Sequence, residues 1–449
     1  MKKTNKKPIN KKLKQHLPLI IILIISLFLR LCNLQYMEFK GDEAFNSIKA
    51  SNLAGGKEFP LTASVGTTGI HESPIFIYLL SIPFLISKNP VTAAAFISIL
   101  NVLAILLLYK FIKKFYNKTA AIIASALCAV NPWQILFSRK IWAQDLLVLF
   151  TIIVIYFLYN AIYNKNKSHI IYALISLGLL VQIHLSALYF ILLVIILIAI
   201  CWKNIDKKYL SIGFILFLVT FIPYLIFQIN NNFIDVKTAL SLKNTPSEFH
   251  TGAFLTPFTL VTTNGFESLF GENYNKFENS AIRIKFLDIL SMAMLFLSIA
   301  FLLAYNKKNL ILILWLIIGT FFLAFSKVDA IDTHYFVSFF PLYFIIIGNA
   351  LALLIKTFPK PAKALIIFLI ILLLSYQLIF DIALINFTKN NECINGNYGM
   401  PYQYRLKNIE STLEKNNKIS DIEKINQLSC NCRKCDIKAA EFIMNYLRS

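Results

Sequence analysis

The sequence has few charged residues and little glycine or proline for its length. Only 15% of its 449 residues are charged, whereas soluble domains usually have about 25%, which excludes an ordinary soluble globular protein. Glycine and proline number 14 each, too few for a collagen-like or low-complexity chain. No Walker A, GxGxxG, HExxH or GxSxG motif stands in a usable context, so we do not expect cytoplasmic nucleotide binding.

Ionisable residues are also rare deep inside the apolar segments. An ion-coupled transporter needs such groups near the middle of the membrane, often beside helices broken by glycine or proline. The two clearest examples, Arg30 and Asp381, stand near the outer ends of the first and last apolar segments. The scarcity of both features disfavours a transporter.

Apolar residues are abundant: they make up 57% of the chain and give a mean hydropathy of +0.65. They form blocks of roughly 17 to 22 residues, the length at which a helix crosses about 30 Å of hydrocarbon. We therefore predict an all-α polytopic membrane protein with about 11 transmembrane helices. A further apolar run, Pro74–Ser87, is too short to span and predicts a re-entrant or interfacial helix. The predicted spans are approximately 17–35, 91–109, 119–137, 146–163, 169–183, 185–202, 209–228, 286–305, 309–326, 335–355 and 364–386.

Lysine positions predict the orientation of the chain. With a cytoplasmic N-terminus and alternating spans, 21 basic residues fall in the cytoplasmic segments, accompanied by one acidic residue, Asp206. This distribution satisfies the positive-inside rule and explains the net charge of +21 without a nucleic-acid partner. The Ile-, Lys- and Asn-rich composition is typical of an AT-rich bacterial genome. We therefore expect a multi-pass protein of a bacterial plasma (inner) membrane, with the N-terminus cytoplasmic and the C-terminus extracytoplasmic.

The chain divides into three parts. Residues 1–16 form a basic cytoplasmic N-terminus, 17–386 the transmembrane domain, and 387–449 a small extracytoplasmic tail. Two outside loops, 36–90 and 229–285, interrupt the transmembrane domain, and juxtamembrane helices are expected in them. Four cysteines of the tail predict two disulfides in an oxidising compartment, although their Cys-x-Cys-x-x-Cys spacing leaves a zinc site as the alternative. They are Cys393, Cys430, Cys432 and Cys435.

The first outside loop contains two acidic motifs. Gly41-Asp42-Glu43-Ala44 follows the first span directly, and His71-Glu72-Ser73-Pro74 opens the short apolar helix. Adjacent carboxylates at a membrane surface can divide two roles, one accepting a proton and the other holding a metal or a hydroxyl-rich substrate. The alternative interpretation is a solvated acidic turn.

Basic and aromatic residues are predicted on the same side of the membrane as these carboxylates. The pair Arg139-Lys140 suits a phosphate, and anchoring beside Trp142 or pairing with Asp145 is the alternative. A lone interfacial histidine is more often a hydrogen-bonding residue than a catalyst, but several on one face suit an enzyme that handles an anionic lipid carrier. The candidates for binding the donor phosphate or substrate are His71, Glu72, Arg139, Lys140, Asp145, His184, His334 and Tyr335.

In this order, the motifs resemble the GT-C superfamily of integral-membrane glycosyltransferases, in the branch of the protein O-mannosyltransferases and lipid A aminoarabinose transferases. The resemblance covers roughly residues 17–355, and Asp42-Glu43 after the first span is its sharpest motif. Members use sugars linked to a polyprenyl phosphate and have the catalytic loop outside the cytoplasm. The resemblance implies that Asp42 accepts the proton and Glu43 supports it. It also implies that Glu72 holds the acceptor or a metal and that His71 contacts phosphate.

The sequence departs from the family pattern at three places. Ser73 stands where the Glu-Lys-Pro branch has lysine, which argues against identity with the aminoarabinose transferases. Gln144 occupies the position of an acid in many relatives, with Asp145 one residue later. His334-Tyr335 stands where relatives often have Arg-Tyr.

We therefore predict a glycosyltransferase, moving a hexose or pentose from a polyprenyl-phosphate-linked donor to an acceptor hydroxyl on the outer face of the membrane. The reaction inverts the anomeric centre, with Asp42 as the base. The acceptor is a glycolipid, a polysaccharide or a protein. Binding of a divalent metal ion by Asp42 and Glu72 is left open as an alternative. Two alternatives are a flippase or transporter of lipid-linked sugars and a non-catalytic protein of cell-envelope assembly.

Overall fold

The computed structural model of the protein describes residues 9–164, 166–242, 249–304, 309–327 and 331–416, together with Ala439, Phe442 and Ile443. Within these residues the regular elements are helices, and β-structure is limited to three isolated bridges. The prediction of an all-α chain is confirmed for this part of the sequence.

Each predicted span coincides with one helix or with two consecutive helices. The helices concerned are α1 (Ile9–Leu31), α4 (Pro90–Phe115), α5 (Lys118–Ala129) with α6 (Pro132–Phe137), α7 (Leu147–Tyr163), α8 (His169–Ile183), α9 (Tyr189–Ile200), α10 (Lys207–Thr220) with α11 (Ile222–Asn230), α16 (Lys285–Ala304), α17 (Leu310–Ala324), α18 (Phe340–Thr357) and α19 (Lys360–Asn390).

Proline explains both interruptions. Pro132 follows Asn131, whose side chain accepts a hydrogen bond from the Gln134 N–H at 3.0 Å and so begins α6 as a separate helix. Pro223 is the second residue of α11, and the chain bends by 52° between α10 and α11. A proline has no N–H to donate and its ring collides with the carbonyl four residues earlier, so a straight helix cannot pass through it.

The predicted count of spans is not confirmed. Among the described residues, five helices are long and apolar enough to cross a membrane, or six if the bent pair α10–α11 is one span. The other apolar helices have between 10 and 17 residues. One of them is α3 (Ile75–Phe84), which lies in the short run Pro74–Ser87.

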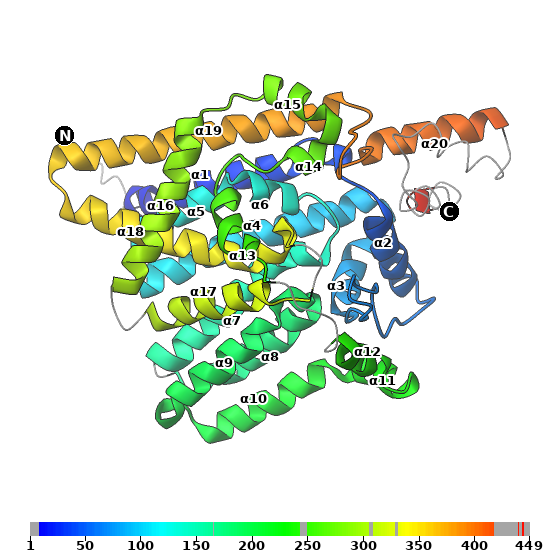
Figure 1. Ribbon diagram of the computed structural model, residues 1–449, viewed down its shortest axis with the longest axis horizontal. Coiled ribbons are helices and arrows are strands. Elements are labelled where there is room, and N and C mark those ends of the chain that lie inside the picture. Colours follow the sequence, from blue (N-terminus) through cyan, green and yellow to red (C-terminus); the bar gives the residue numbers. More distant parts are fainter. Residues whose placement is uncertain are drawn as a thin grey trace, which may run out of the picture.

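The remaining helices lie in the two long loops and the tail. They are α2 (Gly41–Ala54), α12 (Ile234–Ser241), α13 (Gly252–Leu260), α14 (Glu267–Phe270), α15 (Tyr274–Ser280) and α20 (Tyr402–Asn416). Figure 1 shows α2, α3, α12 and α20 at one end of the helical body and the start of α1 at the opposite end. Residues from both predicted outside loops and from the tail therefore meet at one end of the molecule.

Close helix packing holds this end in place. In the body, α5 packs against α4 and α18, while α8 packs against α7 and α10. At the end, α2 packs against α3. Short 3₁₀ helices connect the long ones at the same end: η1 (Leu34–Tyr36), η2 (Ala143–Leu146), η3 (Leu185–Ala187) and η8 (Thr333–Phe339).

The cysteines of the tail are described only in part. Cys393 is disulfide-bonded, whereas Cys430, Cys432 and Cys435 lie outside the described residues. The predicted pairing and the alternative zinc site therefore stay predictions. Cys32, Cys128 and Cys201, which belong to the apolar part of the chain, are free thiols.

Candidate active site

A cavity of about 640 Å³ opens at the end of the molecule where the loops meet. Its polar wall comes from α2, the loop after it, η2 and the start of η3, and its apolar wall from Leu188 and the last turn of α17. Five of the residues singled out in the sequence line it: Asp42, Glu72, His184, His334 and Tyr335.

Asp42 is the second residue of α2, and its side chain is exposed in the cavity. The first turn of a helix favours a negative charge because the unpaired N–H groups there carry partial positive charge. Gly41 and Glu43 on either side are buried. The start of α2 therefore presents a single carboxylate to the cavity.

Glu43, the next residue of α2, is completely buried. Its Oε2 accepts a hydrogen bond from the Lys40 N–H at 2.9 Å, which closes the first turn of the helix. Burial, together with the negative charge of Glu38, raises the pKa of Glu43 to about 7 against the opposing effect of Lys40 and Lys140. Glu43 thus contacts the backbone that positions Asp42 and does not line the cavity.

Glu72 faces the cavity from the other side. Its Oε2 accepts a hydrogen bond from Ser64 Oγ at 2.8 Å, and its Oε1 lies 3.7 Å from His184 Nε2. Burial raises the pKa of Glu72 to about 7, and the charge of Asp42 adds to this rise while Ser64 opposes it. Near neutral pH the cavity therefore contains a carboxyl group that both gains and loses a proton readily.

His184 closes the polar wall between α8 and η3, with 9% of its surface exposed. Its Nε2 lies 3.0 Å from Gln144 Nε2, and its Nδ1 lies 2.8 Å from Ser186 Oγ. Burial lowers the pKa of His184 to about 3, and the nearby His334 acts in the same direction. The imidazole is neutral at pH 7, so it supplies hydrogen bonds to the cavity and no fixed positive charge.

An aromatic group lies beside His184. The His334 and Tyr335 ring centroids are 4.1 Å apart, and the His334 and Trp142 rings form a T-shaped pair with centroids 5.6 Å apart. His334 Nδ1 is 3.5 Å from Asp332 Oδ2. Lys327 also lines the cavity, so two basic side chains, Lys327 and His334, lie in its lining beside the neutral His184.

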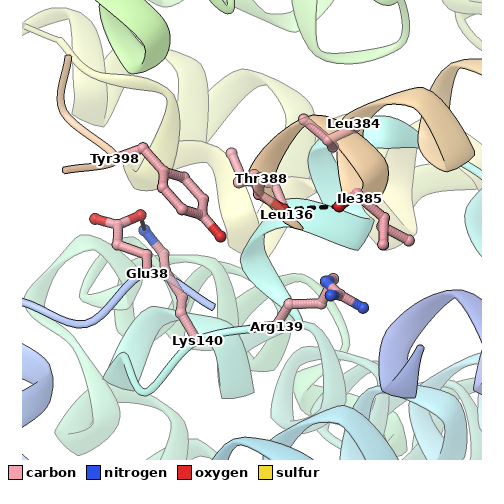
Figure 2. A pocket seen from close by; sticks show the side chains of 8 residues that line it. All are labelled: Glu38, Leu136, Arg139, Lys140, Leu384, Ile385, Thr388 and Tyr398. Carbon is pink, nitrogen blue, oxygen red and sulfur yellow. Dashed lines mark hydrogen bonds and ion pairs between the residues drawn. The ribbon is translucent and has the colours of Figure 1, made fainter. Parts of the chain in front are cut away.

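Arg139 and Lys140 do not line this cavity, and their contacts lie inside the protein. Arg139 donates hydrogen bonds to the carbonyls of Leu29 at 2.6 Å and Arg30 at 3.1 Å, at the C-terminal end of α1. Lys140 Nζ lies 3.2 Å from the centre of the Trp142 ring and 3.5 Å from Glu38 Oε2. Figure 2 shows Lys140 directed toward Glu38 while Arg139 points away from that pair.

Of these contacts, that of Lys140 with Trp142 corresponds to the alternative interpretation of the pair, whereas the contacts of Arg139 belong to neither interpretation. Arg139 satisfies carbonyls that the end of a helix leaves unpaired, and Lys140 is an interior cation beside an aromatic ring. The sequence pattern identifies the charges of such a turn, but the direction of each side chain depends on backbone angles that the pattern does not encode.

Two more predicted residues point away from the cavity. Asp145 Oδ2 accepts a hydrogen bond from the Trp142 N–H at 3.1 Å and is buried, while its neighbour Gln144 lines the cavity. His71 Nδ1 lies 2.7 Å from Asp235 Oδ1, which also accepts from the His71 N–H at 3.1 Å. The contact of His71 is therefore with α12 and not with the cavity.

Sequence reasoning missed Asp235, Gln144, Ser64 and Lys327. Asp235 is one of many acids in the outside loops, and its partner His71 is 164 residues away in the chain. Ser64 lies in a loop without any recognisable motif. Gln144 was noted only as a departure from the family pattern, although that departure marked a cavity residue.

The described residues offer two carboxylates for a metal but no complete ligand set. Asp42 and Glu72 both line the cavity. Among the residues that the structure describes, no group of three or more His, Cys, Asp or Glu side chains is arranged to hold a metal ion.

The chain is similar to one protein family in sequence and to several solved structures in fold. The sequence profile of the family described as dolichyl-phosphate-mannose-protein mannosyltransferase matches residues 71–227. ArnT from Cupriavidus metallidurans in the apo state has 12% sequence identity and a TM-score of 0.62, covering 95% of this chain and 84% of that one. The apo oligosaccharyltransferase of Archaeoglobus fulgidus has 16% identity and a TM-score of 0.56, covering 96% of this chain and 61% of that one. No curated protein matches the chain.

These matches confirm the resemblance to the GT-C superfamily of membrane glycosyltransferases. The chain has the GT-C fold over nearly its whole length. The matched family segment runs from His71 to Phe227 and so includes the wall of the cavity from Glu72 to His184.

Proposed function

We propose that the protein is a glycosyltransferase that moves a sugar from a polyprenyl-phosphate-linked donor to an acceptor hydroxyl in the cavity lined by Asp42. The observation that carries the proposal is the meeting of Asp42, Glu72 and His334 around one cavity in a chain of this fold. An ArnT structure of the same fold is bound to undecaprenyl phosphate. An archaeal oligosaccharyltransferase of the same fold is in complex with a dolichol-phosphate.

The two walls of the cavity suit the two ends of such a donor. Leu188, Phe322 and Phe325 form an apolar surface beside the membrane-embedded helices, which suits a prenyl chain. The opposite wall has carboxyl groups and hydroxyl groups, the latter including those of Ser64 and Thr67, and such groups suit a sugar. The donor phosphate then lies toward Lys327 and His334, since these are the basic side chains, apart from the neutral His184, among the described residues that line the cavity.

In the proposed reaction, Asp42 takes the proton of the acceptor hydroxyl as its oxygen attacks the anomeric carbon. The bond between that carbon and the phosphate oxygen breaks, and the lipid phosphate leaves with the bonding electrons. A single displacement inverts the anomeric centre. Positive charge at the phosphate lowers the barrier because negative charge grows there in the transition state. Glu43, buried behind Asp42, keeps the first turn of α2 closed during the reaction.

The localisation follows from the lysine distribution and is part of the proposal. The cavity lies beside α2, which is at the end of the molecule opposite the start of α1. With a cytoplasmic N-terminus, it opens on the outer face of a bacterial inner membrane. The acceptor, whether glycolipid, polysaccharide or protein, meets the donor on that face.

The test is sugar release or transfer from radiolabelled polyprenyl-phosphate sugars by purified wild type and Asp42→Asn. We expect the variant to retain less than about 1% of wild-type turnover, since losing a general base costs about 10²–10⁴-fold. Asp206→Asn is the matched control, because Asp206 caps α10 through its side-chain oxygen and asparagine caps equally well.

Turnover by Asp42→Asn above a few per cent would remove Asp42 from the role of base. If the wild type binds the lipid but releases no sugar from several donors, the transferase is rejected in favour of a flippase. If Asp42→Asn retains the function of the protein and deletion of the tail abolishes it, a non-catalytic assembly protein is favoured.

A further inference from the structure

The start of the tail lies across the segment that leads into α2. We call residues 394–402 the strap. Its Tyr402 N–H donates to the Met37 carbonyl at 3.0 Å, its Tyr398 hydroxyl donates to the Tyr36 carbonyl at 2.7 Å, and Pro401 forms an antiparallel bridge with Glu38. These contacts join residues about 360 positions apart to the few residues before Asp42.

Aromatic packing seals this contact. The Phe39 and Tyr402 rings meet edge to face at 5.2 Å, and both side chains are almost completely buried. Phe442, from the far end of the tail, packs against Phe39 at 5.6 Å. The strap is therefore part of the core at this end of the molecule and not a loose extension.

The second outside loop holds the strap from behind. The N–H groups of Asn397 and Tyr398 donate to the carbonyls of Ser268 and Leu269 at 2.9 and 3.0 Å. Gly271 and Gly396 allow the two backbones to approach this closely, because a Cβ at Gly271 would collide with the Asn395 carbonyl. Gly271 also has a φ of +51°, which favours glycine.

Lys40 connects the strap to Asp42. Its ammonium group meets Glu38 Oε1 at 2.5 Å and donates to the Asn397 carbonyl of the strap. Its backbone N–H donates to Glu43 Oε2, and its carbonyl accepts from the Ala44 N–H at 3.0 Å, so Lys40 begins α2. The side chain of one residue thus binds the strap while its backbone starts the helix of the proposed base.

A small cavity of about 20 Å³ marks the same junction, with room for about one water molecule. Figure 2 shows Tyr398 of the strap, Thr388 of α19 and the ion pair of Glu38 with Lys140 around it. Lys140 is therefore placed to support Glu38, which in turn holds Lys40.

We propose that the strap is a positioning element for catalysis, which fixes the first turn of α2 through Lys40 so that Asp42 faces the cavity. The proposal rests on the proposed function for its kinetic consequence, while the link between strap and helix stands on the contacts alone. Lys40 and Tyr398 are positioning residues, because neither lines the cavity.

The first test replaces Lys40 in the full-length protein. We expect Lys40→Met to lower kcat by about 10- to 100-fold, because small displacements of a catalytic group have effects of this size, while the KM for the donor stays within about twofold. Lys40→Arg retains a cation that can reach Glu38 and Asn397, so it should recover most of the lost kcat. Lys407→Met, on the exposed face of α20, is the matched control and should leave kcat unchanged. Unchanged kcat in Lys40→Met would overturn the proposal.

A second pair of variants removes hydrogen bonds without changing charge. Tyr398→Phe loses the bond to the Tyr36 carbonyl, whereas Tyr404→Phe loses a bond to Lys389 within the tail. We expect kcat to fall in Tyr398→Phe and not in Tyr404→Phe. Equal kcat in both would show that the contact with residues 34–40 has no special role and would overturn the proposal.

Hydrogen exchange separates this proposal from the proposed function, because it needs no turnover. Mass spectrometry of a peptide that covers residues 37–50 should show faster exchange in Lys40→Met and Tyr398→Phe than in wild type and both controls. Unchanged exchange would overturn the proposal even in an active enzyme. Faster exchange in Lys40→Met and Tyr398→Phe, in a protein whose wild type transfers no sugar, would keep the strap and reject only the glycosyltransferase.

Discussion

At the scale of single residues, the cavity combines an exposed carboxylate with a carboxyl group of high proton affinity. Asp42 is open to the cavity, whereas burial raises the pKa of Glu72 to about 7. Below that pH a protonated Glu72 is neutral and can donate a hydrogen bond to a phosphate oxygen. Above it, the carboxylate repels an anionic donor. For the proposed donor, we therefore expect Glu72 to make binding depend on pH.

This dependence gives a prediction for Glu72→Gln, whose amide is neutral at every pH. In the wild type, the KM for the donor should rise as the pH rises through about 7, because Glu72 becomes charged. In Glu72→Gln the rise should be absent, and KM at pH 8 should be lower than in the wild type. Steady-state kinetics from pH 5.5 to 8.5 measure both.

Glu58→Gln is the matched control, since Glu58 is exposed and pairs with Lys49 away from the cavity. Glu58→Gln should show the same dependence of the donor KM on pH as the wild type. The same rise of KM in Glu72→Gln as in the wild type would assign the titration to another group.

The sequence identified the type of chemistry better than the direction of the side chains. Asp42 and Glu72 belong to motifs, and both line the cavity. Arg139, Lys140 and Asp145 belong to a motif as well, but they face inward. The turn from Ser138 to Trp142 directs Arg139 to the end of α1 and Lys140 to Glu38, and Asp145 in η2 accepts from a backbone N–H. No spacing rule predicts side-chain direction in a non-helical turn.

At the scale of elements, a hairpin forms one wall of the cavity. The Ala63 N–H donates to the Glu72 carbonyl and the Glu72 N–H to the Ser64 carbonyl, each at 2.8 Å, and Val65 forms a bridge with His71. His71 then binds Asp235 of α12, which also accepts from Tyr224 of α11 at 2.7 Å. The hairpin is thus fixed to the second outside loop by one buried carboxylate.

We expect Asp235→Ala to loosen the hairpin and so raise the KM of the sugar substrates roughly tenfold. Hydrogen bonds to a charged group contribute about 1.5–3 kcal/mol, and about 1.4 kcal/mol corresponds to a factor of ten in binding. Asp235→Asn keeps an acceptor oxygen for the His71 N–H and should stay near the wild-type KM. Transfer kinetics with both variants test this, and equal KM values for Asp235→Ala and wild type would refute the role of the pair.

At the scale of the whole molecule, the apolar pattern predicted where the helices lie but not how they are interrupted. Every predicted span contains helix, because apolar blocks of this length must satisfy their backbone hydrogen bonds internally. The breaks at Pro132 and Pro223 lie within apolar runs and change the hydropathy little. The strap was not predicted either, since a polar tail shows no signal for the segment against which it folds.

The orientation of the molecule gives the last prediction. The start of α1 and the tail helix α20 lie at opposite ends, and from the lysine distribution we expect the end with the start of α1 to face the cytoplasm. A membrane-impermeant maleimide added to intact cells should therefore label Lys57→Cys, which is exposed in the first outside loop, and not Lys203→Cys, which is exposed after α9. Labelling of wild type gives the background of the native thiols, and permeabilised cells should label both variants. The reverse pattern would place the cavity in the cytoplasm, where a donor on the outer leaflet could not reach Asp42.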